Sequence, residues 1–137
     1  MMTLSKESLK IEREPDVIFF RNKAKELAVK IGMSMVGQTK LITAASELVR
    51  NMLRYANGGE AILEIVVRNN VKGVRLTFVD KGPGIKDIKQ AMQDGFSTGR
   101  SLGLGLPGAK RLANEFDIKS EVGKGTTVSI IRWKNGV

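Results

Sequence analysis

Two hairpin patterns constrain the fold of this 137-residue chain more than any other feature of its sequence. Residues 61–68 and 73–80 are rich in Ile, Val and Leu, and a short run with two asparagines joins them. Residues 118–122 and 126–133 repeat the pattern around two glycines. Segments of this kind, joined by such short turns, are typical of antiparallel strands. The sequence therefore predicts a largely antiparallel sheet.

Helical periodicity accounts for much of the remaining chain. Apolar residues recur at helical spacing over residues 17–31, which Gly32 ends, and over residues 38–56, which two further glycines follow. The other expected elements are an edge strand over residues 2–13, a short polar helix over residues 87–92 and a third helix over residues 105–116. This order predicts an α+β fold: a two-layer sandwich in which helices cover one face of the sheet.

The composition limits both the architecture and the chemistry. A chain with 42% hydrophobic and 27% charged residues has the balance of a globular protein, and its length predicts a single domain over residues 1–137. No window approaches the roughly 18 apolar residues of a membrane span, and residues 1–6 show no export signal. We therefore expect a cytoplasmic protein with no membrane partner.

The chain contains no Cys and no His. Their absence excludes thiol catalysis, Cys/His zinc sites and every scheme that uses imidazole as the base. Any chemistry must therefore use carboxylates, hydroxyls, amides, lysines or a bound ion.

The formal net charge of +9 raises the question of nucleic-acid binding. The excess of basic residues is spread evenly, because each third of the chain carries three more Lys and Arg than Asp and Glu. A basic arm would concentrate that excess, and one Tyr, one Trp and five Phe offer few stacking platforms. We therefore expect no nucleic-acid partner.

Glycine is distributed unevenly, since seven of the fifteen glycines fall between Gly82 and Gly108. Residues 103–108 match the G-x-G-x-x-G string of dinucleotide-binding folds. That fingerprint requires a strand running directly into it, whereas turn-forming residues precede it here. The G-x-x-x-x-G-K-[ST] string of P-loop proteins is absent. The glycine-rich segment therefore indicates a phosphate or nucleotide site of another kind.

Asp80 follows a strand directly, and Gly82 and Gly84 leave space beside it for a flat ligand. A carboxylate accepts hydrogen bonds, so it suits the exocyclic amine of adenine and opposes the carbonyl that guanine carries at that place. Gly103 and Gly105 bring backbone N–H groups to the start of a helix, where phosphate oxygens are favoured. Taken singly, these glycine segments are also compatible with turns and flexible loops.

Glu47 and Asn51 are four residues apart in an expected helix and therefore face the same way. The Asn51 amide oxygen could hold a metal ion, and Glu47 could act as a base. Taken alone, the pair is also compatible with a solvated helix face.

Taken together and in this order, four segments resemble the GHKL (Bergerat-fold) superfamily of ATPases and kinases. Residues 47–51 resemble its N box, residues 80–84 its first glycine box, residues 103–106 its second, and residues 125–128 its closing glycine-threonine element. The resemblance covers residues 36–134. Within the superfamily, the amino-acid sequences of the later segments are most similar to those of the small bacterial serine/threonine kinases, in particular the stressosome switch kinase. They are also similar to those of the related anti-sigma-factor kinases.

This resemblance implies an ATP- and Mg²⁺-dependent kinase that phosphorylates STAS-domain scaffold and antagonist proteins and then activates a PP2C-type phosphatase. It implies Glu47 as the catalytic residue and Asn51 as the metal ligand. The cofactor-binding residues that it implies are Asp80, Gly82, Gly84, Arg100, Gly103, Leu104, Gly105, Leu106 and Thr126. An anti-sigma-factor kinase that sequesters a sigma factor directly remains the alternative. The sequence of residues 51–55 departs from that of the anti-sigma-factor kinases, which counts against direct sigma-factor binding without excluding it.

Overall fold

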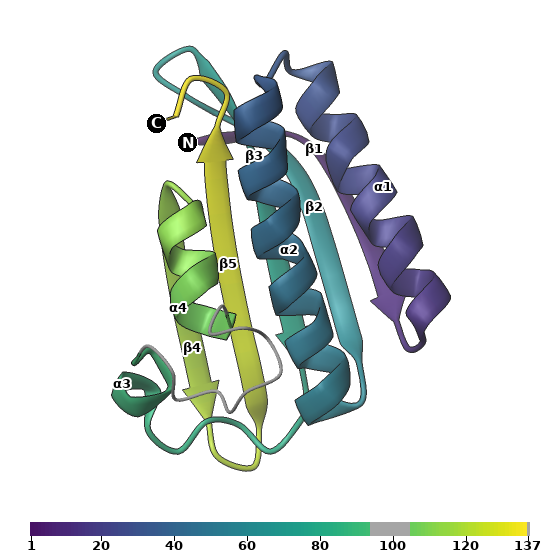
Figure 1. Ribbon diagram of the computed structural model, residues 1–137, viewed down its shortest axis with the longest axis vertical. Helices are drawn as coiled ribbons and strands as arrows, with labels where there is room; N and C mark the ends of the chain where they lie inside the picture. The colour runs from purple at the N-terminus through teal and green to yellow at the C-terminus, as the bar shows by residue number, and fades with distance from the viewer. Residues whose placement is uncertain (94–104, 137) are drawn as a thin grey trace.

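The computed structural model describes residues 1–93 and 105–136. Five strands form one sheet in the order β1-β2-β3-β5-β4, and all four neighbouring pairs are antiparallel (Figure 1). The strands are β1 (Met2–Ile11), β2 (Gly59–Arg68), β3 (Val71–Asp80), β4 (Glu115–Glu121) and β5 (Gly125–Trp133). The helices are α1 (Glu14–Lys30), α2 (Met35–Ala56), α3 (Ile88–Ala91) and α4 (Gly105–Leu112).

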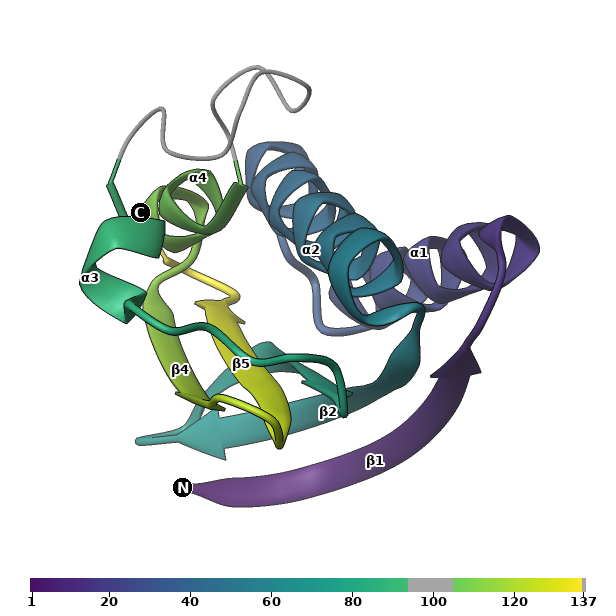
Figure 2. The ribbon, with the colours of Figure 1, turned by 90° about the horizontal axis from the view of Figure 1, so that it is seen from below.

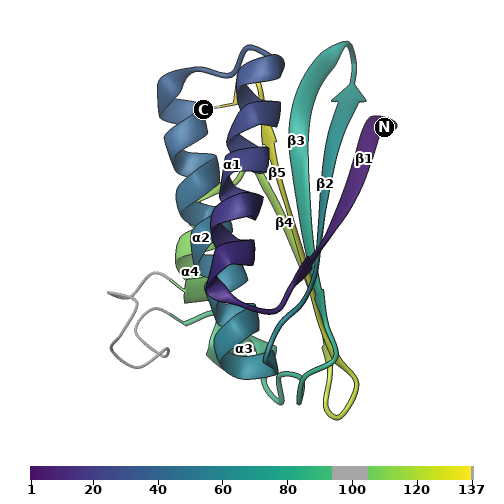
Figure 3. The ribbon, with the colours of Figure 1, turned by 90° about the vertical axis from the view of Figure 1, so that its right-hand side faces the viewer.

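The molecule has two layers, with α1, α2 and α4 on one face of the sheet (Figures 2 and 3). The main core lies between the layers, where apolar faces of α1 and α2 meet alternate residues of β2 and β3. Phe20 of α1 packs edge-on against Phe78 of β3, with ring centroids 5.4 Å apart. The predicted α+β sandwich is therefore confirmed, and so is the position of the first strand at an edge of the sheet. No helix in the described ranges is long and apolar enough to cross a membrane.

The helix α2 runs through the centre of the helical layer, and its ends follow from local chemistry. The Ser34 hydroxyl accepts a hydrogen bond from the Gly37 N–H at 3.1 Å, which caps the first turn. The helix therefore begins three residues earlier than the apolar spacing predicted. It ends at Asn57, whose φ of 58° is left-handed. Its inward face, which includes Leu41, Leu48 and Met52, is buried.

The two predicted hairpins are present. Asn69 and Asn70 connect β2 to β3, and their φ angles of 51° and 66° are those of the two-residue turn that best matches the twist of paired strands. Asparagine adopts this left-handed conformation at a lower cost than most other residues. The second hairpin joins β4 to β5 through residues 122–124.

The third helix is shorter than its periodicity predicted. The sequence predicts a helix over residues 105–116, but α4 ends at Leu112 and β4 begins at Glu115. Asn114 explains the early ending: its N–H donates to the carbonyl of Ile131, and its side-chain oxygen accepts from the N–H of Trp133. Pairing with the open edge of β5 therefore replaces the last helical turn, because strand pairing satisfies these backbone groups.

The outer face of the sheet carries a partly buried ion pair. The Arg75 guanidinium donates two hydrogen bonds to the Glu64 carboxylate, at 2.8 and 2.9 Å. Glu64 is only 6% exposed. Because these bonds favour the ionised acid, they hold the pKa of Glu64 below its ordinary value of 4.5, and the Thr3 hydroxyl and nearby Lys6 add to the effect. This pair lies on the opposite face from the helices and links β2 to β3.

Candidate active site

The predicted ligand-binding residues gather around one cavity of about 960 Å³. It lies where the C-terminal half of α2, the end of β3, the start of β5, α3 and the start of α4 come together, at the lower end of the view in Figure 1. Five predicted residues line it: Asn51, Asp80, Gly84, Leu106 and Thr126. This volume is in the upper part of the range for small-molecule and cofactor sites.

Asp80 is positioned by two backbone donors. Its Oδ1 accepts hydrogen bonds from the Gly82 N–H at 2.9 Å and from the Thr126 N–H at 3.2 Å. The second bond follows from strand register, since Asp80 and Thr126 are paired at the ends of β3 and β5. Within the described ranges, the other carboxylate oxygen has no hydrogen-bond partner. It is therefore left to accept a hydrogen bond from a donor in the cavity.

The glycines beside Asp80 are required mainly by chain packing. A Cβ at Gly82 would lie 2.5 Å from the Cβ of Ala56, and one at Gly84 would lie 2.3 Å from the carbonyl oxygen of Glu121. The sequence predicts that both glycines leave space for a ligand, and in the structure the position that a Cβ would take at each of them is already occupied by protein atoms. Gly84 nevertheless lines the cavity.

Gly125 is a residue that the sequence argument did not assign to the site. Its φ is +115°, and a Cβ there would lie 2.0 Å from the carbonyl oxygen of Asp80. Only glycine allows β5 to begin this close to the end of β3. The detectable signal was its place directly before Thr126 in the closing glycine-threonine element.

Ser120 is a second residue that the sequence argument missed. Its Oγ accepts a hydrogen bond from the Ile85 N–H at 2.7 Å, donates to the Gly125 carbonyl at 3.1 Å and lies 2.7 Å from the Thr126 hydroxyl. A serine hydroxyl has one proton, so the Thr126 hydroxyl donates to Ser120 and presents an acceptor to the cavity. No local pattern marks Ser120, because its role depends on lying opposite Thr126 in the β4–β5 pair.

The inner wall of the cavity is apolar. Leu48 and Met52 contribute from α2, and Phe78 and Val128 contribute from the sheet. These residues belong to the buried core, which extends to the bottom of the cavity. An apolar wall beside one convergent acceptor suits a planar heterocycle that carries a hydrogen-bond donor at its edge.

Asn51 and Glu47 both lie on α2, and of these two residues Asn51 lines the cavity and Glu47 does not. Glu47 lies one helical turn earlier and is half-buried. No group of three or more acidic residues in the described ranges could hold a metal ion. A single amide oxygen fits Mg²⁺ only if phosphate oxygens and water supply the other ligands, which is the usual environment of this ion at nucleotides.

The start of α4 borders the same cavity. Gly105 is its first residue, with a left-handed φ of 49°, and Leu106 lines the cavity. Pro107 lies in the first turn, as the sequence predicted. The predicted residues Arg100, Gly103 and Leu104 lie outside the described residues.

Residues 37–136 match the family described as histidine kinase-, DNA gyrase B-, and HSP90-like ATPases. This match covers most of the chain, and the described geometry agrees with it. The chain therefore belongs to this ATPase family, which is the GHKL family that the sequence motifs indicated, and membership implies ATP binding.

Within this family the chain belongs with serine/threonine-protein kinases. It is 42% identical over 125 residues to the serine/threonine-protein kinase RsbT of Bacillus subtilis, covering 91% of this chain and 94% of the relative. It is 33% identical over 121 residues to an anti-sigma F factor of Geobacillus kaustophilus, covering 85% and 83%.

A solved structure confirms the fold. The RsbU and RsbW domains of Rv1364c from Mycobacterium tuberculosis match with a TM-score of 0.63 and 19% identity, covering 93% of this chain. The match spans about a third of that longer chain, 31% of its length. At this identity, the likeness concerns the fold alone.

Proposed function

We propose that this protein is an ATP- and Mg²⁺-dependent kinase that phosphorylates serine or threonine on STAS-domain scaffold and antagonist proteins of a stressosome. In this proposal it acts in the cytoplasm by partner switching and, once released from its substrates, activates a PP2C-type phosphatase. The observation that carries the proposal is the similarity to RsbT over 94% of the length of that relative.

The geometry around Asp80 supports adenine recognition. The unpaired oxygen of the Asp80 carboxylate accepts a hydrogen bond from the exocyclic amine of adenine, and the Thr126 hydroxyl offers a second acceptor. The apolar wall of the cavity covers the plane of the base. Guanine would place a carbonyl oxygen against the carboxylate, so ATP is favoured over GTP. The phosphates extend toward the start of α4, where the helix dipole favours negative charge.

Asn51 and Glu47 act where the terminal phosphoryl group of ATP is transferred. The Asn51 amide oxygen would hold the Mg²⁺ that accompanies the phosphates, and a bound Mg²⁺ would supply neutralisation of the charge on the transferring phosphoryl group. Glu47 orients the hydroxyl of the substrate and accepts its proton as the oxygen–phosphorus bond forms and ADP leaves. Arg100, Gly103, Leu104 and Gly105 are proposed contacts of the phosphates, and Gly82 and Gly84 complete the turn beside the base.

Transfer of labelled phosphate tests the proposal. The chain is incubated with γ-labelled ATP, MgCl₂ and individual STAS-domain proteins, and mass spectrometry identifies the modified residue. We expect phosphoserine or phosphothreonine in at least one partner, no transfer with EDTA and no transfer with Glu47→Gln. Intact ATP binding without transfer to any STAS protein would contradict the kinase proposal.

Sequestration of a sigma factor is the second candidate function, because the chain is also similar to anti-sigma F factors at 33% identity over 121 residues. In this alternative, ATP binding shapes a surface that holds the sigma factor. Size-exclusion chromatography with sigma factors, in the presence of ATP or ADP, separates the two functions. A stable nucleotide-dependent complex would favour the alternative.

A further inference from the structure

Three polar residues lie side by side on the strands next to the nucleotide cavity, and we call them the polar row. Asp80 pairs with Thr126 between β3 and β5, and Thr126 pairs with Ser120 between β5 and β4. Residues that lie directly opposite each other on neighbouring strands project from the same face of the sheet, with Cβ atoms about 5 Å apart. Asp80 and Thr126 line the cavity, whereas Ser120 lies behind Thr126 and does not. Ser120 therefore acts on a bound ligand through its neighbours.

The hydroxyl protons of the polar row have one arrangement that satisfies every contact. The Ser120 Oγ lies 3.1 Å from the Gly125 carbonyl oxygen, which can only accept a hydrogen bond. The single proton of Ser120 therefore points to that carbonyl. The Thr126 hydroxyl, 2.7 Å from the same Oγ, must then donate its own proton to Ser120. As a result, the Thr126 proton points away from the cavity.

The cavity side of the polar row is left with two acceptors. One is the Asp80 carboxylate oxygen that the backbone donors do not hold, and the other is a lone pair of the Thr126 hydroxyl. An exocyclic amine carries two N–H groups, one for each acceptor. A carbonyl oxygen at the same place carries none and faces both acceptors at once, which leaves all three oxygens unpaired. The polar row therefore favours a base with an amine at this place.

Ser120 also supports the wall of the cavity beside the base. Its Oγ accepts a hydrogen bond from the Ile85 N–H at 2.7 Å, and Ile85 lines the cavity. The Pro83 carbonyl accepts a hydrogen bond at 2.8 Å from the N–H of Gly123, in the β4–β5 turn. The turn after β3 is therefore fixed to the β4–β5 hairpin at two points. Loss of the Ser120 hydroxyl would loosen this wall as well as free the Thr126 proton, so the experiment has to separate the two effects.

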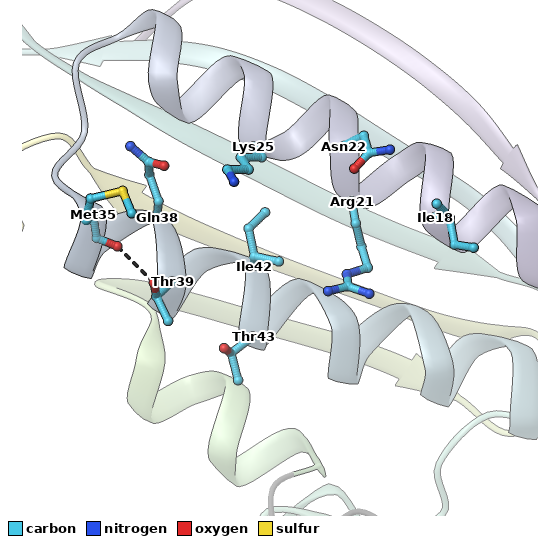
Figure 4. A pocket seen from close by; sticks show the side chains of 9 residues that line it. All are labelled: Ile18, Arg21, Asn22, Lys25, Met35, Gln38, Thr39, Ile42 and Thr43. Carbon is cyan, nitrogen blue, oxygen red and sulfur yellow. Dashed lines mark hydrogen bonds between the residues drawn. The ribbon is translucent and has the colours of Figure 1, made fainter.

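A second cavity, of about 430 Å³, lies between α1 and α2 and offers a contrast (Figure 4). None of its nine lining residues is acidic, and two of them, Arg21 and Lys25, carry hydrogen-bond donors only. Because donors of this kind oppose an amine, this second cavity lacks the selectivity of the polar row. Calorimetry should therefore find one amine-selective site per chain.

We propose that Ser120 is a positioning residue that selects nucleotides with an amine at position 6 of the purine. It holds the Thr126 hydroxyl as an acceptor, so that each of the two N–H groups of the amine meets an acceptor. Ser120 itself touches neither the nucleotide nor the reacting atoms. This inference rests on the proposed adenine recognition and adds the residue that sets its selectivity.

Isothermal titration calorimetry with ATP and ITP tests this role, because ITP carries a carbonyl where ATP carries the amine. The full chain is titrated in the presence of MgCl₂, as wild type and as Ser120→Ala. We expect the ratio of ATP affinity to ITP affinity to fall about tenfold in the variant, because the freed Thr126 hydroxyl can rotate and donate to the carbonyl. The wild type should also bind N⁶-methyl-ATP about tenfold more weakly than ATP, since a methyl group replaces one N–H proton.

Two controls separate the proton of Thr126 from a general effect on packing. Ser129→Ala removes a hydroxyl from the opposite face of β5, where the Ser129 Oγ lies 3.3 Å from the Thr77 hydroxyl, and the affinity ratio should stay within about twofold. In a Thr126→Val background, adding Ser120→Ala should also change the ratio by less than about twofold, because no threonine proton is left to redirect. Loosening at Ile85 would instead weaken the binding of both nucleotides together in either background. Thermal unfolding verifies that all variants fold.

An unchanged affinity ratio in folded Ser120→Ala would overturn the role of Ser120 and leave ATP binding and the kinase function intact. Binding of N⁶-methyl-ATP as tight as that of ATP would overturn it in the same way, without any variant. A wild-type protein that binds ITP as tightly as ATP would refute adenine recognition by Asp80, and the role of Ser120 with it.

Discussion

Replacing Asp80 with asparagine isolates the one interaction proposed to select the base. Asparagine has the shape of aspartate and keeps an oxygen at the Oδ1 position, so the N–H groups of Gly82 and Thr126 remain paired. The turn after β3 and the start of β5 therefore keep their hydrogen bonds. The change is confined to the cavity, where an NH₂ group replaces the free carboxylate oxygen.

The expected loss follows from the hydrogen bonds involved. The variant loses one hydrogen bond to a charged acceptor, worth about 1.5–3 kcal/mol, and places two donors against each other, leaving a buried donor unpaired at a cost of about 1–3 kcal/mol. A combined loss of about 3–5 kcal/mol corresponds to roughly 150- to 5,000-fold weaker ATP binding. The new NH₂ group can donate to the guanine carbonyl, so the preference for ATP over GTP should also fall.

Isothermal titration calorimetry with ATP and GTP measures both effects, and thermal unfolding confirms that Asp80→Asn folds. Asp117→Asn is the matched control, because Asp117 is exposed on β4. ATP affinity within about threefold of wild type, in a variant with normal thermal stability, would refute base recognition by Asp80.

Three other variants test the site and the fold. Glu47→Gln should keep nucleotide affinity within about twofold and lose phosphate transfer, as calorimetry and a transfer assay measure, because Glu47 is proposed to act only at the reacting end. Equal loss of affinity in the Asp80 and Glu47 variants would contradict this division. The depressed pKa of Glu64 stabilises the fold above about pH 4.5 and loses this contribution as the pH falls. Urea unfolding should therefore show a weaker acid dependence in Glu64→Gln, and an unchanged pH profile would contradict the ion pair. Gly125→Ala should lower the free energy of unfolding by about 3 kcal/mol, because its Cβ would meet the Asp80 carbonyl. Gly123→Ala, with a similar positive φ but open space, should cost about 1 kcal/mol, so equal losses would refute the packing argument.

Much of the fold could be predicted because its signals are local. The asparagine turn between β2 and β3, the helical spacing in α1 and α2, and the order of the elements all follow from the conformational preferences of short segments. The end of α4 could not be predicted in this way. Residues 113–116 fit a helical period, but pairing with β5 places Asn114 at the start of a strand connection.

The features of the candidate site also fall into two groups, those set by local sequence and those set by tertiary contacts. The sequence by itself determined that Asp80 ends a strand beside glycines and that Glu47 and Asn51 share a helix face, since both depend on spacing within one element. Only the tertiary structure decided that Ser120 supports Thr126 and that Gly125 must be a glycine because the end of β3 passes so close. These features join residues distant in sequence. Their contacts depend on strand register and helix packing, which a local pattern does not encode.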